Sequence, residues 1–234
     1  LPEEAIEDAV QQVENLAGPN LVTTNLAFHR MLTEGVDVSF EDPDQGTRHD
    51  KCWLVSFDEM GLNECLAVNQ YTVKHGQHTR RPDIVLFING IPLVVIELKN
   101  ATDPQATIKK AWNQLQTYHK QIPSLHQYGT IEIVSDGLEA RYGTLSAGLQ
   151  HFSRWPTVDG VNMDPTGTPE LDSLTKGLLQ PDRLLDIARN FTVFAGQRGD
   201  PIKMVAKYHQ VFAVNKAVAS TLVAIRGDRR AGVV

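Results

Sequence analysis

Residues 80–100, RRPDIVLFINGIPLVVIELKN, decide the fold of this chain. Two uninterrupted apolar runs, Ile84–Ile88 and Leu93–Ile96, are typical of strands that are buried on both faces. Asn89-Gly90 between them is a strong signal for a β-hairpin. The stretch therefore predicts a hairpin in the centre of the core, with polar residues at its open end.

This hairpin brings two carboxylates together at its open end. With a three-residue loop, 89–91, residues whose numbers sum to 180 face each other, so Asp83 lies opposite Glu97. A two-residue loop shifts the pairing by one position and leaves them neighbours. Directly paired side chains lie about 5 Å apart at Cβ, where two carboxylates repel each other. Because an ionised carboxylate near a core is costly unless it is paired or metal-bound, a divalent cation between them is favoured.

Lys99 adds a positive charge to the same place. It follows Glu97 by two positions, so both side chains project from one face of the strand. Oxygen ligands favour Mg²⁺ over Zn²⁺, and Mg²⁺ can polarise a phosphoryl oxygen and activate water. Lys99 would hold the attacking water or stabilise charge on the phosphate. The residues alone leave an alternative open, in which Glu97 and Lys99 form a solvated ion pair and Asp83 is a turn residue.

Strands and helices alternate along the rest of the chain. Asp103-Pro104 predicts an N-cap and first turn of a helix that ends near Ile122. Residues 153–169 are rich in proline and glycine and predict a surface loop. The remaining patterns predict helices at 3–17, 21–32, 170–179, 182–190 and 203–224, and strands at Val36–Phe40, Cys52–Phe57, Cys65–Val73 and Ile131–Val134.

Composition limits the class of protein. Cys52 and Cys65 make no disulfide framework, no apolar run is long enough to span a membrane, and no secretory signal is present. We therefore expect a cytoplasmic protein with no membrane contact. The net charge of −6 argues against a domain that binds nucleic acid without help. If the chain handles DNA, we expect other chains or domains to supply most of the phosphate contacts.

Pro82-Asp83 followed by Glu97-Leu98-Lys99 matches the PD-(D/E)xK nuclease motif. The chain around it resembles the nuclease region of the restriction (motor) subunit of Type I restriction-modification enzymes. The resemblance implies an α/β fold with a PD-(D/E)xK restriction-endonuclease-like core, a mixed sheet flanked by helices. It is carried by NLAFHRML (25–32), NQLQTY (113–118), IPSL (122–125), SDGLEARYGT (135–144) and YHQVFAVNKAV (208–218).

The resemblance assigns roles to residues of the motif. Asp83 and Glu97 would bind Mg²⁺, together with the backbone carbonyl of Leu98, and Lys99 would be the catalytic lysine. Gln114 and Tyr118 match the QxxxY pattern of this nuclease branch. Their spacing puts both on one helix face, where they would close over the site or touch DNA. Simple helix packing is the alternative for this pair.

Basic residues near the motif are candidates for contacts to DNA. Arg80 and Arg81 lie just before Asp83, and Lys109 and Lys110 lie on the helix that carries Gln114. Each would contact backbone phosphates. A solvated loop and a solvated helix face are the alternatives.

The resemblance also suggests a division into domains. We expect an endonuclease domain over residues 1–190 that lacks the upstream strand and helix of the family, a linker over 191–202, and the start of a RecA-like helicase domain over 203–234. Gln210, in Tyr208-His209-Gln210, would read the adenine of ATP. Because no GxxxxGK[ST] loop is present, ATP would be a cofactor of the full-length enzyme only.

The implied function is Mg²⁺-dependent cleavage of double-stranded DNA. In the family, cleavage follows ATP-driven translocation and needs the modification (methyltransferase) and specificity subunits. Two alternatives remain at this stage. One is a repair or recombination nuclease with the same motif, and the other is a catalytically silent DNA-docking module.

Overall fold

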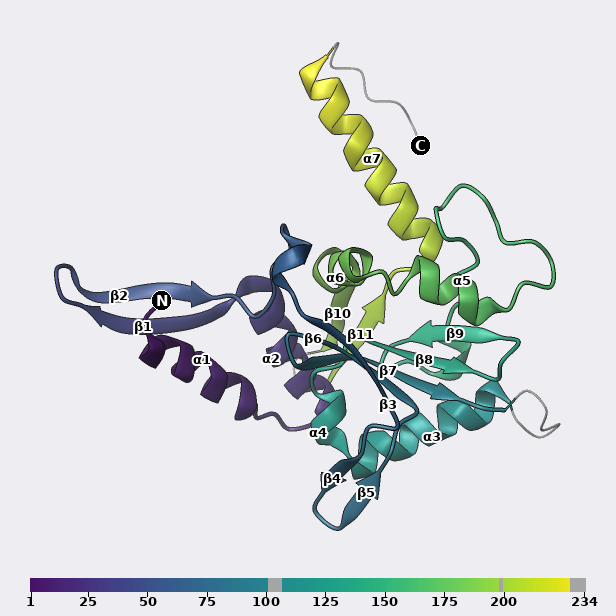
Figure 1. The fold of residues 1–234 in the computed structure, drawn as a ribbon, viewed down its shortest axis with the longest axis horizontal. Coiled ribbons are helices and arrows are strands. Elements are labelled where there is room, and N and C mark those ends of the chain that lie inside the picture. The colour runs from purple at the N-terminus through teal and green to yellow at the C-terminus, as the bar shows by residue number, and fades with distance from the viewer. Residues whose placement is uncertain (101–106, 198–199, 228–234) are drawn as a thin grey trace.

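The computed structural model describes residues 1–100, 107–197 and 200–227, and a five-stranded sheet forms its centre (Figure 1). The strands follow the order β3-β6-β7-β8-β9, and only β7 and β8 are parallel. The predicted mixed sheet is therefore confirmed. The strands are β3 (Cys65–Asn69), β6 (Ile84–Ile88), β7 (Ile91–Leu98), β8 (Ile131–Ser135) and β9 (Ala140–Gly143).

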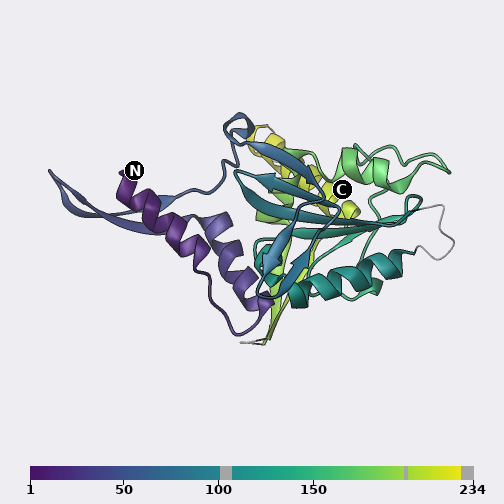
Figure 2. The ribbon, with the colours of Figure 1, turned by 60° about the horizontal axis from the view of Figure 1, so that its bottom comes forward.

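Helices cover both faces of this sheet (Figure 2). Because side chains alternate along a strand, β7 contributes side chains to two separate cores. Val95 packs in the core that includes Leu115, whereas Ile96 packs in the core that includes Leu184. The first face is covered by α3 (Ile108–Gln121) and α4 (Pro123–His126); the second by α2 (Leu21–Glu34), α5 (Glu170–Gly177) and α6 (Pro181–Asn190).

The β6–β7 hairpin turns on two residues rather than three. Asn89 and Gly90 have φ angles of 50° and 77°, which a tight hairpin turn requires and which these two residue types tolerate. The strands then contain a bulge at Leu93, after which the pairing is Ile84 with Ile96. Of the two loop lengths considered, the structure has the shorter one. The bulge restores the predicted register at the open end of the hairpin.

The N-terminal part forms a smaller unit beside the sheet. A hairpin of β1 (Val36–Asp42) and β2 (Gly46–Cys52) extends away from the body and packs on α1 (Glu3–Glu14) (Figure 1). The predicted strand Cys52–Phe57 was wrong, because β2 is a polar and exposed strand that ends at Cys52. Hydrophobic alternation cannot reveal a strand whose two faces are both solvated.

Other boundaries also differ from the prediction. The segment Cys65–Val73 is divided, since β4 (Val73–His75) pairs with β5 (His78–Arg80) in a separate hairpin. Helix α3 begins at Ile108, with the side chain of Thr107 as its N-cap. The predicted cap at Asp103-Pro104 lies outside the described residues. Two short 3₁₀ turns occupy Met60–Leu62 and Leu149–His151.

Two strands occupy most of the segment that we expected to be a linker, residues 191–202. β10 (Thr192–Gln197) and β11 (Asp200–Val205) pair antiparallel, and the last helix, α7 (Tyr208–Arg226), begins later than predicted. Figure 1 shows α7 extending away from the body. Across the described ranges, no helix is long and apolar enough to cross a membrane.

A buried lysine joins the hairpin of β10 and β11 to the rest of the fold. Lys203 is 2% exposed, and its Nζ donates to Asn25 Oδ1 at 2.9 Å and to the carbonyl of Gly129 at 2.7 Å. Asn25 Nδ2 also donates to the carbonyl of Gln127 at 2.9 Å. A buried amine is costly without hydrogen bonds, and Lys203 makes them with residues outside the hairpin. The hairpin is therefore packed as part of the core.

Candidate active site

Asp83 is held between the ends of two strands. Its Oδ2 accepts from the backbone N–H of Leu98 at 2.8 Å, and its Oδ1 accepts from Gln70 Nε2 at 2.8 Å. The carbonyl of Asp83 also accepts from the N–H of Gln70 at 2.7 Å. Gln70 has a φ of 53°, so it turns the chain just after β3. The side chain of Gln70 is exposed and belongs to no sequence motif. The sequence therefore gave no signal for this role.

Glu97 lies on β7 beside Asp83 and is only 1% exposed. Its Oε1 accepts from Lys99 Nζ at 2.6 Å. Its Oε2 is buried and has no hydrogen-bond partner among the described residues. Burial is the main cause that raises the pKa of Glu97 to about 6; the hydrogen bond from Lys99 lowers it, and the charge of Asp83 raises it further.

Helix α3 contributes two side chains above this pair. Lys99 Nζ donates to Gln114 Oε1 at 2.8 Å, and Gln114 Nε2 lies 2.6 Å from the hydroxyl of Tyr118. Burial raises the pKa of Tyr118 to about 12, so its hydroxyl keeps its proton at neutral pH. The structure therefore brings together Asp83, Glu97, Lys99, Gln114 and Tyr118, all of which the sequence analysis singled out.

The predicted basic residues lie around this group rather than within it. Arg80 Nε donates to Gln121 Oε1 at 2.5 Å, which joins β5 to the end of α3. Arg81 is exposed, and Lys109 and Lys110 are exposed in the first turn of α3. Arg81 and Lys109 are therefore accessible at the surface near this group.

Gln210 is not part of this group. Its Oε1 accepts from the backbone N–H of Lys207 at 2.8 Å and so caps the start of α7. Val211, the next residue, packs in the core on the sheet face opposite α3.

The residues present suit a divalent cation with oxygen ligands. Asp83 and Glu97 offer carboxylates, and the hydrogen bond between Asp83 and Leu98 places that peptide group beside them. The buried Glu97 Oε2 makes no hydrogen bond of good geometry in the described part of the chain, although the Tyr118 hydroxyl interacts with this carboxylate and lowers its pKa. A buried carboxylate oxygen without a partner is costly unless a ligand satisfies it, and Mg²⁺ prefers such oxygens.

One known family matches most of the chain. Residues 2–151 match the family described as Type I restriction enzyme R protein N terminus. The chain belongs to this family. The matched residues include the sheet strands from β3 to β9 and the whole candidate site.

Similar curated proteins are named as endonuclease subunits of type I restriction enzymes. The chain is 40% identical over its whole length to the Type I restriction enzyme HindI endonuclease subunit of Haemophilus influenzae. It is 33% identical over its whole length to a protein of Methanocaldococcus jannaschii that is named as the MjaIXP endonuclease subunit of a type I restriction enzyme. The chain spans 23% and 24% of the length of these two relatives, so it corresponds to part of each.

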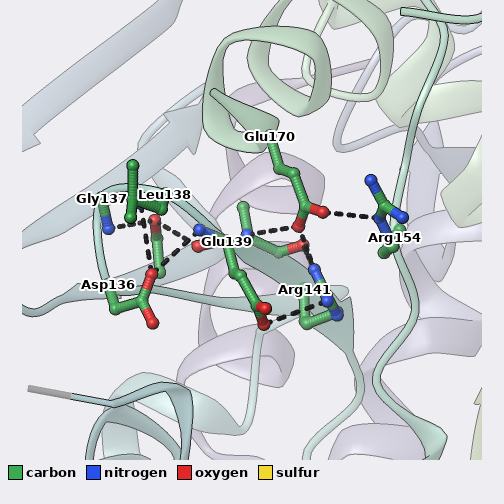
Figure 3. A network of polar contacts seen from close by, with 9 residues as sticks. Asp136, Gly137, Leu138, Glu139, Arg141, Arg154 and Glu170 are labelled. Atoms are coloured by element: carbon green, nitrogen blue, oxygen red, sulfur yellow. Dashed lines mark hydrogen bonds and ion pairs between the residues drawn. The ribbon is translucent and has the colours of Figure 1, made fainter. Parts of the chain in front are cut away.

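In this R protein N terminus, the segment 135–144 that contributed to the resemblance has a structural role. Asp136 Oδ1 accepts from the backbone N–H groups of Leu138 and Glu139 and so closes the turn between β8 and β9 (Figure 3). Glu170 forms ion pairs with Arg141 and Arg154, which tie α5 to the sheet. None of these contacts involves Asp83 or Glu97.

Proposed function

We propose that this chain is the Mg²⁺-dependent nuclease part of a Type I restriction enzyme and that it cleaves double-stranded DNA. The observation that supports this most strongly is the buried carboxylate of Glu97, whose Oε2 makes no hydrogen bond of good geometry among the described residues and which lies in a group with Asp83 and Lys99. A buried carboxylate oxygen without a hydrogen bond favours the binding of a cation. Membership in the R protein family supports restriction as its use.

Each residue of the group has a role in this proposal. Asp83, Glu97 and the carbonyl of Leu98 would hold Mg²⁺. When bound, Mg²⁺ would neutralise charge on the scissile phosphate and activate water for attack. Lys99 would donate hydrogen bonds to a phosphate oxygen or to that water.

Residues around the site would position the lysine and the substrate. Gln114 holds the ammonium of Lys99, and Tyr118 holds the amide of Gln114, so both act through Lys99. Arg80, Arg81, Lys109 and Lys110 would contact the DNA backbone. Such contacts position the duplex and carry no sequence information.

The remaining partners belong to the longer protein in this proposal. The modification and specificity subunits would select the DNA, which suits a chain with a net charge of −6. Residues from Lys203 onward would lead into an ATP-driven motor, in which Gln210 would leave its capping bond to read adenine.

The test uses the complete motor subunit, assembled with its modification and specificity partners. Cleavage of supercoiled DNA and ATP hydrolysis are measured in the same reaction for the wild type and for Asp83→Ala. We expect cleavage to fall by at least about 10³-fold while ATP hydrolysis persists, because the nuclease site would be separate from the motor. Asp44→Ala, which removes an exposed carboxylate in the β1–β2 turn, is the matched control. Persistent cleavage by Asp83→Ala would favour a silent docking module and contradict the proposal.

A further inference from the structure

A second cluster of ligand-type side chains lies under the same helix as the candidate nuclease site. His119 is near the end of α3, His126 ends α4, and Glu132 is on β8. Glu132 pairs in register with Val95, two positions before Glu97 on β7. Because residues two apart project from one strand face, this cluster and Glu97 both lie beneath α3.

The three side chains converge on one point. His119 Nε2 lies 2.5 Å and His126 Nδ1 lies 2.7 Å from the same oxygen, Glu132 Oε1. One ligand atom from each residue lies within 4.8 Å of the other two. Glu132 and His126 are buried, while the His119 side chain is 11% exposed and so reaches toward the surface.

Two polar atoms of the cluster lack partners. In the described ranges, neither Glu132 Oε2 nor His126 Nε2 has a hydrogen-bond partner. Leaving such atoms unsatisfied in a core is costly. An ion held by both oxygens of Glu132 would satisfy Oε2, whereas His126 Nε2 points away from the converging atoms and would stay without a partner.

We propose that His119, His126 and Glu132 form a binding site for a divalent transition metal of the zinc class. Two imidazoles and a carboxylate suit Zn²⁺ or Co²⁺, whereas Mg²⁺ and Ca²⁺ prefer oxygen ligands alone. The site is thus chemically distinct from the oxygen site at Asp83 and Glu97. Three protein ligands leave a coordination position for water.

The observed geometry needs little change to accept such an ion. Ligand atoms about 2.0 Å from a tetrahedral zinc lie about 3.3 Å from one another. The present nitrogen-to-oxygen distances of 2.5 and 2.7 Å are set by protons that the ion would replace. The rings and the carboxylate would therefore separate by less than about 1 Å.

Protons compete with the metal at this site. Burial lowers the pKa of His119, but the charge of Glu132 and its hydrogen bond together raise it above its usual value, so the metal must displace a proton from that ring. The ammonium of Lys203 also interacts with Glu132, although its hydrogen bonds go to Asn25 and Gly129. Binding should therefore strengthen as the pH rises.

Such a metal would fix the helix that carries the nuclease side chains. It would join the end of α3 to α4 and to β8, and Tyr118 is the residue next to His119. Gln114 and Tyr118 would then be held over Lys99 by a structural ion as well as by packing.

The test is titration of the full chain with Co²⁺, followed by its visible absorption. The wild type should bind one equivalent with the intense spectrum of a four-coordinate site, and Zn²⁺ should displace it. His119→Gln and Glu132→Gln should each weaken binding by at least about tenfold. His75→Gln and His78→Gln, which alter exposed histidines in the β4–β5 hairpin, are the matched controls and should bind as the wild type does.

Other outcomes decide against the site. Absence of saturable Co²⁺ binding in the wild type, undiminished binding in both cluster variants, or loss of binding in the β4–β5 controls would each overturn the proposal. Asp83→Ala should keep the Co²⁺ spectrum, which separates this site from the nuclease site. If a cluster variant does not fold, ¹⁵N spectra of the wild-type histidine rings replace it. Zn²⁺ must then shift the resonances of His119 and His126, and unshifted rings would also overturn the proposal.

Discussion

The carboxylate of Asp83 accepts a hydrogen bond of 2.8 Å from the backbone N–H of Leu98. This bond joins the residue that precedes β6 to the last residue of β7, at the end of the hairpin far from its turn. The main chain of β7, which carries Glu97, therefore fixes the orientation of Asp83, the other proposed metal ligand. Gln70 holds the second oxygen of Asp83 from the end of β3. The predictions below follow from this arrangement and its surroundings.

Replacing Glu97 with glutamine should make the metal-free protein more stable above pH 6. The folded state holds the proton of Glu97 up to a pKa of about 6, whereas the unfolded chain releases it near 4.5. The free energy of unfolding therefore falls as the pH rises from 4.5 to about 6, and it does not recover at higher pH. We expect Glu97→Gln to gain about 1 kcal/mol at pH 8 and nothing below pH 4.

Urea unfolding at several pH values, without divalent ions, measures this effect. Mg²⁺ should stabilise the wild type and leave Glu97→Gln unchanged, because the variant lacks the proposed ligand. Identical pH profiles for the two proteins would show that burial of Glu97 carries no cost.

Replacing Tyr118 with phenylalanine should slow cleavage without affecting the fold. The hydroxyl lies 2.6 Å from Gln114 Nε2, and Gln114 in turn accepts from Lys99. Loss of the hydroxyl frees the amide to rotate away from the lysine, so we expect cleavage to fall about tenfold. Single-turnover cleavage by the assembled enzyme measures it. Tyr128→Phe, which removes a hydroxyl bonded to the carbonyl of Val13, should cleave like the wild type.

Truncating Lys203 to alanine should destabilise the folded chain strongly. The change leaves Asn25 Oδ1 and the carbonyl of Gly129 without this donor and removes a buried side chain between α2 and β11. We expect a loss of about 2–4 kcal/mol in the free energy of unfolding, measured by urea denaturation. Lys216→Ala, on the exposed face of α7, should change it by less than about 0.5 kcal/mol. Equal stability of the two variants would show that the contacts of Lys203 do not stabilise the fold, as expected if residues 191–202 were only a linker.

Replacing Asp136 with alanine should cost stability but not activity. Its carboxylate closes the turn between β8 and β9 by accepting from two backbone N–H groups. We expect the free energy of unfolding to fall by about 1 kcal/mol, while the folded enzyme cleaves DNA at the wild-type rate. Thermal melting and cleavage below the melting range measure the two effects. A folded variant that no longer cleaves DNA would give the SDG segment a chemical role instead.

The sequence alone determined the centre of the fold and the pairing of its acidic residues. Continuous apolar runs, an Asn-Gly turn and a period of two are local properties, so they predict a buried hairpin and a shared face for Glu97 and Lys99. They also placed Gln114 and Tyr118 on one helix face. The sequence left the loop at two or three residues, and the structure has two, with a bulge at Leu93 that pairs Ile84 with Ile96.

Only the tertiary structure decided which distant residues meet. Gln70 reaches Asp83, Lys203 reaches Asn25, and two histidines converge on Glu132, and no local period encodes such contacts. The polar strand β2 and the strands β10 and β11 were also missed, and each pairs with a neighbouring strand in an antiparallel hairpin. Local sequence sets the conformation of a segment, whereas burial and charge pairing across the chain select its neighbours.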